Sequence, residues 1–383
     1  MDISNKKIVI ATHYLVYGAP QALREYLINK NIKELLFIGH PLKTDESKSY
    51  QEINQNGVPT YNAASTLRTR ISIFNYAIEF LLTLYWVLSK KTQYDLYIGV
   101  DPLNACAGVL LKKMRRIKKL VYYTIDYVPE RFSNKYLNDF YHWLDKLCLS
   151  NADETWNVSP RIAEGREKVR GLKKSVYKKQ KVVPIGIWFD RIKRLPFEKI
   201  KKHQLLFIGH LLEKQGVQIV LEAIPTIIKS IRDFHFLIVG GGEYESKLKI
   251  KIKKLKIDNY VTMTGWVKDR EKLDAVMSDS ALAIAMYDKK LDTFTYYADP
   301  TKLKDYLSAG LPILLTDLPY NAHEIEKNKC GLIIDYNAKV VASSVISLLR
   351  KSKTLQDYRK NAINYIQKFD WDIVFTNAIK SIW

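Results

Sequence analysis

The stretch His203–Gly216 reads HQLLFIGHLLEKQG and joins a short apolar run to a glycine-containing turn. Residues 203–209 have the length and the Leu/Ile/Phe content of a buried strand, and a helical pattern follows over 214–230. A strand that ends in a tight turn and leads into a helix is the repeating unit of a doubly wound parallel sheet. This stretch therefore predicts an α/β fold whose ligands bind beyond the strand ends.

The same alternation continues through the second half of the chain. Further strand-length apolar runs lie at 234–239, 260–264, 281–285, 312–316 and 331–335. Helical patterns separate them at 243–256, 270–278, 301–309, 320–328 and 338–351. Strands that alternate with helices in this way indicate βαβ units and a parallel sheet.

The first half shows a second series of the same kind. We expect strands at 7–11, 34–39, 94–100, 119–124 and within 151–159, and helices at 20–30, 70–90 and 103–115. A chain of 383 residues exceeds one ordinary hydrophobic core. We therefore predict two Rossmann-like, doubly wound domains over 1–185 and 186–354, followed by a helical segment at 355–383.

The charge balance is strongly basic. Lys and Arg number 61 against 40 Asp and Glu, a net charge of +21, while 47% apolar and 26% charged residues exclude a disordered chain. The excess concentrates in KKMRRIKK at 112–119 and in 171–202. Such a charge favours nucleic acid, an anionic membrane face or phosphorylated ligands as partners, and a Lys-rich solvated surface is the alternative explanation.

Cysteine usage and the apolar segments indicate a cytoplasmic protein. The cysteines form no CxxC pair, which excludes a disulfide framework and a cysteine-based zinc site: Cys106, Cys148 and Cys330. The apolar run near the N-terminus is too short for a signal peptide. Residues 72–88 (SIFNYAIEFLLTLYWVL) contain Asn75 and Glu79 and are too short to span a bilayer. They predict a core helix, or alternatively a helix on the inner face of the membrane.

Glycines and lysines follow several of the expected strands. Gly209 ends the strand at 203–209, and Lys214 stands before the next helix. Gly240–Gly242 and Gly265-Trp266 end the next two strands. Glycine permits a close backbone approach, and a helix start favours phosphate. Each of these turns also has a purely structural explanation, so none is specific alone.

The segment Asp299–Pro312, DPTKLKDYLSAGLP, carries the strongest pattern. A helix that begins at Pro300 leaves its first amides for phosphate oxygens, namely those of Thr301, Lys302 and Leu303. The Lys302 ammonium would reinforce them. Asp305, about one turn further along, is placed to accept both hydroxyls of a ribose.

Taken in order and spacing, these motifs resemble the family 4 glycosyltransferases, retaining enzymes of the GT-B fold. The resemblance covers nearly all of the C-terminal half and, more loosely, the N-terminal half. It implies two Rossmann-like domains facing each other across a cleft, with a nucleotide sugar in the second. It also implies that the segment 355–383 crosses back to the first domain. The implied reaction transfers a hexose-type sugar to an acceptor hydroxyl, with retention and without a metal or other cofactor.

The family's residues carry over unevenly. His210 stands where the family usually has an Arg, and Gln215 stands where it has a Lys, with Lys214 one position earlier. Asp305 takes the place of the second of two paired glutamates, and the first falls on Tyr297. Asp299 is the nearest acid and is our candidate substitute.

In the first half, Tyr17–Pro20 resembles the family's glycine loop, and Asp126 follows a strand where the family often has a histidine. Asp126 is equally typical of a strand-end turn. The resemblance thus implies these catalytic residues: Asp126, Lys214 and Asp299. It implies these donor-binding residues: Gly18, Gly209, His210, Lys214, Gly241, Gly265, Pro300, Thr301, Lys302, Leu303 and Asp305.

The acceptor is the least determined partner. The basic runs and the apolar segment 72–88 favour a lipid-linked or cell-envelope glycan precursor. A nucleic-acid-binding protein, or a glycosyltransferase acting on nucleic acid, is the alternative, but no recognisable nucleic-acid-binding motif supports it. A phosphorylase or epimerase on the same fold is a third possibility, and no pyridoxal lysine site is recognisable for the former.

Overall fold

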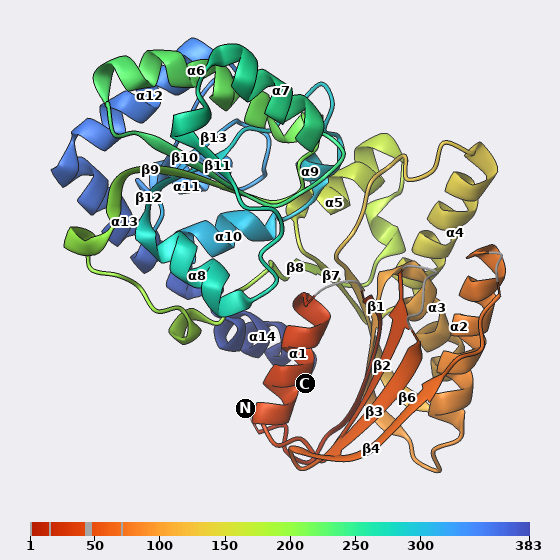
Figure 1. Cartoon of the computed structure of the whole chain (residues 1–383). Helices are drawn as coiled ribbons and strands as arrows, with labels where there is room; N and C mark the ends of the chain where they lie inside the picture. Colours follow the sequence, from red (N-terminus) through yellow and green to blue (C-terminus); the bar gives the residue numbers. More distant parts are fainter. Residues whose placement is uncertain (1, 15–16, 43–47, 70–71) are drawn as a thin grey trace. The chain divides into compact units, whose positions relative to one another are not determined.

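The computed structural model describes residues 2–14, 17–42, 48–69 and 72–383, without the side chains of residues 72 and 73. The chain forms two compact units, Met1–Pro184 with Trp371–Trp383, and Ile185–Asp370 (Figure 1). The first boundary lies one residue before the expected one. Residues 355–370, expected in the crossing segment, belong to the second unit, and only the part from Trp371 onward belongs to the first.

The first unit is built on an eight-stranded sheet with the order β4-β3-β2-β1-β5-β6-β7-β8. The strands are β1 (Lys7–Tyr14), β2 (Glu34–Pro41), β3 (Ser49–Gln55), β4 (Val58–Ser65), β5 (Tyr94–Val100), β6 (Ile117–Thr124), β7 (Glu154–Asn157) and β8 (Gln180–Val182). All pair in parallel except β3 and β4. The predicted parallel strands are confirmed, because runs such as Ile8–Ala11 are buried on both faces of the sheet.

Helices cover both faces of this sheet (Figure 1). They are α1 (Ala19–Asn29), α2 (Ser72–Leu88), α3 (Asp101–Lys113), α4 (Lys135–Asn151), α5 (Pro160–Glu164) and α14 (Trp371–Lys380). Helices α2, α3 and α4 share one hydrophobic core with the sheet. Helix α14 packs on α1, where the Tyr26 and Phe375 rings lie 5.6 Å apart and the Tyr26 hydroxyl bonds Thr376 at 3.1 Å.

Several elements of the first unit were not predicted, including the short strand β8. Another is the antiparallel hairpin of β3 and β4, whose turn at Asn56 and Gly57 has positive φ at both residues. An Asn-Gly pair between two alternating runs is the usual signal for such a turn. A third is α4, which begins where the Asn134 side chain accepts a hydrogen bond from the Leu137 amide.

The second unit has a six-stranded parallel sheet with the order β11-β10-β9-β12-β13-β14. Its strands are β9 (Lys201–Ile208), β10 (His235–Val239), β11 (Val261–Met263), β12 (Ser280–Ala285), β13 (Ile313–Leu315) and β14 (Gly331–Ile333). Its helices are α6 (Val217–Ser230), α7 (Glu245–Leu255), α8 (Arg270–Asp279), α9 (Phe294–Tyr297), α10 (Thr301–Ser308), α11 (Ala322–Lys327), α12 (Ala338–Arg350) and α13 (Ser352–Ile366). Two apolar clusters flank the sheet, which confirms the doubly wound architecture.

Helix α13 shows why residues 355–370 stay with the second unit. The Arg359 side chain is 4% exposed. Its guanidinium donates to the carbonyl oxygens of Ser278 and Leu195 at 3.2 Å, and of Gly310 at 3.4 Å. These bonds fix α13 to three segments of this unit: the turn after α10, the end of α8 and the segment before β9.

No helix in the described part of the chain has the length and apolar character needed to cross a membrane. Helix α2, the one such segment considered above, has 17 residues.

Candidate functional site

The order of the second sheet places a switch point between β9 and β12, where the winding reverses direction. Ligands of doubly wound proteins bind beyond the carboxyl ends of the strands at such a point. Gly209 follows β9 there, with φ of +142°. A side chain at Gly209 would meet the Lys302 Nζ, because an added Cβ lies 2.8 Å from it. Because glycine has no side chain, the Lys302 ammonium fits beside Gly209.

The glycines after β10 and β11 hold the neighbouring loops together. The Gly240 amide donates to the Gly265 carbonyl oxygen at 2.9 Å, and a Cβ at Gly240 would lie 1.9 Å from the Gly209 oxygen. A Cβ at Gly241 would lie 2.8 Å from the Trp266 indole nitrogen. Close packing of chain on chain therefore explains Gly240 and Gly241, whereas Gly265 has open space at the Cβ position and a positive φ of +70°.

Lys302 lies in the first turn of α10, and its side chain reaches back to the loop after β9. Its Nζ donates to the Gln215 Oε1 at 2.6 Å and lies 4.5 Å from the centre of the Phe207 ring and 5.5 Å from that of Tyr287. Burial among these rings lowers the pKa of Lys302 to about 7, and the nearby Asp292 carboxylate opposes the shift.

Lys214 is the second cation at this point. Its side chain is 27% exposed, and its Nζ lies 3.2 Å from the Oδ1 of the fully buried Asp292. Asp292 also accepts hydrogen bonds from the Thr295 amide at 2.9 Å and hydroxyl at 2.5 Å. Asp292 was not predicted, and Gln215 was noted only as the residue in the position of the family's Lys. The Asp-x-x-Thr pattern before α9, typical of a helix cap, is the signal that was available for Asp292.

The start of α10 differs in one respect from the expectation. The Leu303 amide, predicted to be available for phosphate, donates to the Pro300 carbonyl oxygen at 3.1 Å. The amides of Thr301 and Lys302 have no acceptor among the described residues, and Thr301 is exposed. The helix start therefore offers two amides rather than three.

Asp305 lies one turn further along α10, and its side chain is 17% exposed. Its Oδ1 lies 2.8 Å from an Arg270 guanidinium nitrogen, and Arg270 is also 2.8 Å from Asp274. The sequence analysis missed Arg270. On the other side of the site, the exposed His210 ring contacts Trp266 edge-on, with the ring centres 4.8 Å apart.

Asp299 lies in a different environment from the other predicted residues. Its side chain is fully buried, its Oδ2 accepts from the Ile185 amide at 2.8 Å, and its Oδ1 lies 3.5 Å from the equally buried Lys304 Nζ. Burial raises the pKa of Asp299 and lowers that of Lys304. This carboxylate has no solvent-exposed surface and ties the start of the unit to α10.

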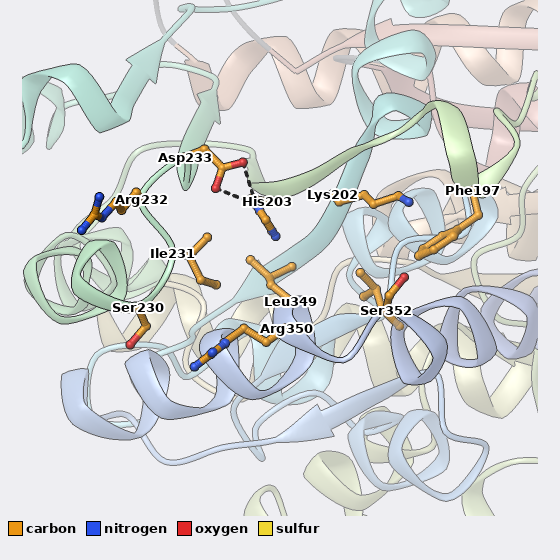
Figure 2. Close-up of a pocket in the computed structure, with 11 residues that line it drawn as sticks. Phe197, Lys202, His203, Ser230, Ile231, Arg232, Asp233, Leu349, Arg350 and Ser352 are labelled. Carbon is orange, nitrogen blue, oxygen red and sulfur yellow. Dashed lines mark hydrogen bonds and ion pairs between the residues drawn. The ribbon is translucent and has the colours of Figure 1, made fainter.

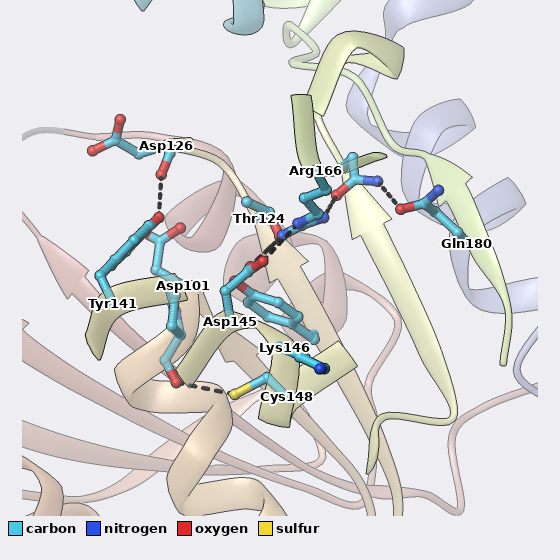
Figure 3. A network of polar contacts seen from close by, with 12 residues as sticks. Asp101, Thr124, Asp126, Tyr141, Asp145, Lys146, Cys148, Arg166 and Gln180 are labelled. Atoms are coloured by element: carbon cyan, nitrogen blue, oxygen red, sulfur yellow. Dashed lines mark hydrogen bonds and ion pairs between the residues drawn. The ribbon is translucent and has the colours of Figure 1, made fainter. Parts of the chain in front are cut away.

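The remaining predicted residues belong to the first unit. Gly18 caps α1 with an extended backbone, and its amide donates to the Gln21 side chain at 3.0 Å. Asp126 follows β6, where its carboxylate is 2.8 Å from Arg131 and its carbonyl accepts from Tyr141 (Figure 3). Burial, with a smaller contribution from Asp126, raises the pKa of the neighbouring Asp101 to about 7. Asp101 was also missed, although it directly follows an expected strand.

A hollow of about 360 Å³ opens elsewhere in the second unit (Figure 2). Lys202, His203, Asp233 and Arg350 are among its lining residues, and His203 is 2.7 Å from Asp233. Lys202, His203 and Asp233 lie at the amino ends of β9 and β10, and Arg350 ends α12. Since the candidate site lies at the carboxyl ends of the same strands, the hollow is separate from it.

Comparison with known proteins points to the same part of the chain as the candidate site. Residues 189–365, a little less than half of the chain, match the family model described as "Glycosyl transferases group 1". The poly(glycerol-phosphate) alpha-glucosyltransferase of Bacillus subtilis is 23% identical over 373 residues, which cover 95% of this chain and 51% of that protein. The phosphatidyl-myo-inositol mannosyltransferase of Mycobacterium leprae is 21% identical over 52% of each chain. The chain spans about half the length of the curated relatives it matches.

Solved structures share the fold at low sequence identity. Sucrose-phosphate synthase from Thermosynechococcus elongatus matches with a TM-score of 0.74 at 15% identity, over 99% of this chain and 98% of that one. Anabaena HepE, solved with UDP and glucose, matches with a TM-score of 0.71 at 14% identity, over 99% of each. The nucleic-acid alternative finds no support in these comparisons, and membership of family 4 stays a prediction. Residues 189–365 therefore match the model of the glycosyl transferases group 1 family, and the chain has the GT-B fold.

Proposed function

We propose that this protein is a retaining glycosyltransferase, which moves a hexose-type sugar from a nucleoside-diphosphate sugar to an acceptor hydroxyl. One observation carries the proposal: Lys214 and Lys302 converge on the switch point between β9 and β12, within the segment that matches the group 1 model. Two cations beside the start of a helix form a site suited to a diphosphate.

The arrangement fits stabilisation of the leaving group. The diphosphate gains negative charge as the sugar–oxygen bond breaks, and cations that are already in place stabilise that charge. Gln215 holds the Lys302 ammonium in position at 2.6 Å. The Phe207 and Tyr287 rings keep water away from it, which strengthens its attraction for phosphate oxygens.

The nucleoside side of the donor has its own candidates. Asp305 accepts the ribose hydroxyls, sharing its carboxylate with Arg270. Trp266, which is 54% exposed, offers a ring face on which a base stacks. The proposal leaves Asp299 out of the ligand contacts because its side chain is fully buried.

The acceptor side is assigned to the first unit. We infer that Asp126, whose side chain is 37% exposed, is the polar group there. A lipid-linked or cell-envelope glycan precursor is the acceptor class. Its support is the +21 charge, which suits a phosphate-bearing acceptor, and the names of two relatives that act on glycerol-phosphate polymer and on phosphatidyl-inositol.

Release of nucleoside diphosphate tests the proposal directly. A thermal-shift screen with UDP-, GDP- and ADP-sugars identifies the donor, because a ligand that binds the folded state stabilises it. We then expect Lys214→Ala and Lys302→Ala each to lower turnover by about 100-fold or more. Lys249→Ala is the matched control, since this lysine is 59% exposed on α7 and pairs with Glu245 four residues before it. Undiminished turnover in both site variants would overturn the assignment.

A further inference from the structure

Helix α2 buries three polar side chains and exposes three large apolar ones, although its Leu84, Trp86 and Val87 pack into the core. Asn75, Glu79 and Thr83 recur every four residues and are 3%, 3% and 1% exposed. The outward side chains are more than half exposed: Phe74, Leu81 and Tyr85. A surface helix of a protein surrounded by water has the opposite arrangement.

The buried polar side chains of α2 fix this orientation. The Glu79 Oε2 lies 3.0 Å from the His13 Nε2 at the end of β1. The Thr83 hydroxyl lies 2.8 Å from the His40 Nε2 at the end of β2, and burial lowers the pKa of His40 to about 3. Because these groups have partners inside the unit, α2 cannot rotate its apolar side inward without leaving them unpaired.

Helix α4 repeats the inversion. Its inward side includes three polar side chains that are less than a tenth exposed: Asn138, His142 and Asp145. Asp145 is 2.6 Å from the buried Arg166, in a network that continues to Thr124 and Gln180 (Figure 3). Its outward aromatic side chains are 84%, 57% and 57% exposed, in this order: Tyr136, Phe140 and Trp143.

The two inverted helices contribute to one face of the first unit. Helix α3 packs between α2 and α4, and all three helices lie on the same side of the sheet (Figure 1). Leu110 of α3 and Met114, which caps the C-terminal end of α3, are also exposed. Exposed bases lie along this face: Lys113, Arg115, Lys135 and Lys146. Of the four acids of the three helices, Glu79 and Asp145 are buried, Asp101 is half-buried at the start of α3, and Asp139 pairs with Arg170 at 3.2 Å.

We propose that this α2–α4 face docks on the surface of a lipid bilayer that contains anionic lipids. Exposed aromatic and aliphatic side chains enter the headgroup–acyl boundary, and the bases contact the anionic headgroups. The inference deepens the proposed function and rests on it in one respect, because a lipid-linked acceptor lies in such a bilayer. A second copy of the chain is a poorer occupant, since self-association would bring like charges of a +21 protein together.

Vesicle co-sedimentation of the full chain tests the proposal. We expect binding to phosphatidylcholine vesicles that contain phosphatidylglycerol, and weaker binding to phosphatidylcholine alone. Phe140→Ser with Trp143→Ser, and separately Leu81→Ser with Tyr85→Ser, should each weaken binding by about tenfold or more. Ile250→Ser is the matched control, because Ile250 is 67% exposed on α7 of the other unit.

Donor binding distinguishes this inference from the proposed function. The surface variants should keep the thermal shift that the nucleotide sugar produces, because they lie outside the donor site. Vesicle binding equal to that of the unaltered chain in both pairs of variants, or no binding to anionic vesicles, would overturn the inference and leave the proposed function standing. Sedimentation as a dimer that the surface variants convert to a monomer would also overturn it, by assigning the face to a second copy.

Discussion

The lowered pKa of the partly buried Lys302 makes a specific prediction about proton uptake on donor binding. Its pKa of about 7 means that the ammonium is about half formed in the ligand-free protein near neutral pH. A bound diphosphate favours the charged form. Binding above pH 7 must therefore take up a proton, whereas binding well below pH 7 finds the lysine already charged.

The size of the effect follows from that pKa. At pH 8 about one free molecule in ten carries the charged lysine, so donor binding should take up about 0.9 proton. If the bound lysine stays charged, the Kd rises about tenfold for each pH unit above 7, or about 100-fold between pH 6 and pH 9. That factor corresponds to about 2.7 kcal/mol.

Titration calorimetry in two buffers with different ionisation heats measures the uptake. A nucleotide sugar is the right ligand, because its diphosphate carries no group that titrates near pH 8. Lys302→Met should abolish both the uptake and the pH dependence, while Lys214→Met should weaken binding and keep the uptake. His210→Gln removes the imidazole at the site as a further control. An uptake that persists in Lys302→Met would refute the reasoning.

Other predictions concern stability. Arg166→Met should lower the free energy of unfolding by about 3–5 kcal/mol in urea denaturation, because it leaves the buried Asp145 carboxylate unpaired. Gly240→Ala should lower both the free energy of unfolding and the donor affinity, because its Cβ would lie 1.9 Å from a backbone oxygen. Gly171→Ala is the control: this glycine has a positive φ but no atom within 4 Å of the added Cβ, so the free energy of unfolding should fall by about 1 kcal/mol. Asp299→Asn should lower stability by about 3 kcal/mol and leave the Kd for the donor nearly unchanged, and a loss of turnover without a loss of stability would show that this carboxylate contacts the sugar.

The parallel strands could be predicted because their sequences carry a simple signal. Strands such as β5 and β9 are buried on both faces, so they read as continuous apolar runs bounded by turns. The hairpin of β3 and β4 lacks that signal, because SYQEINQ is largely polar and β4 is mostly exposed. Only the Asn56-Gly57 turn marks it.

Helix α4 escaped prediction for a physical reason. Periodicity reveals a helix when its apolar side is the buried one. In α4 the buried residues include Asn138 and Asp145, and three of the four aromatic residues (Tyr136, Phe140 and Trp143) are exposed, so KYLNDFYHWLDK offers no apolar stripe to recognise. The same inversion that supports membrane docking thus hides the helix in the sequence.

The candidate site was predictable where strand ends and helix starts define it. Gly209, Lys214 and Lys302 gather at one point because parallel strands end at the same edge. Asp292 lies in the irregular connection after β12, where neither the helical period nor the strand period of apolar residues applies. The burial of Asp299 could not be read from its neighbours in the chain, because it depends on contacts with the distant Ile185.

The return of the chain's last helix to the first unit has a consequence for synthesis on the ribosome. Residues up to 184 emerge first, but the helix that covers Tyr26 begins only at Trp371. At about 5–20 residues per second, translation of the intervening stretch takes on the order of 10–40 s. During that interval the first unit waits with one apolar surface uncovered, while the second unit is still being synthesised and ends only at Asp370. Nascent-chain proteolysis should therefore find α1 open to cleavage until Trp371–Lys380 has emerged.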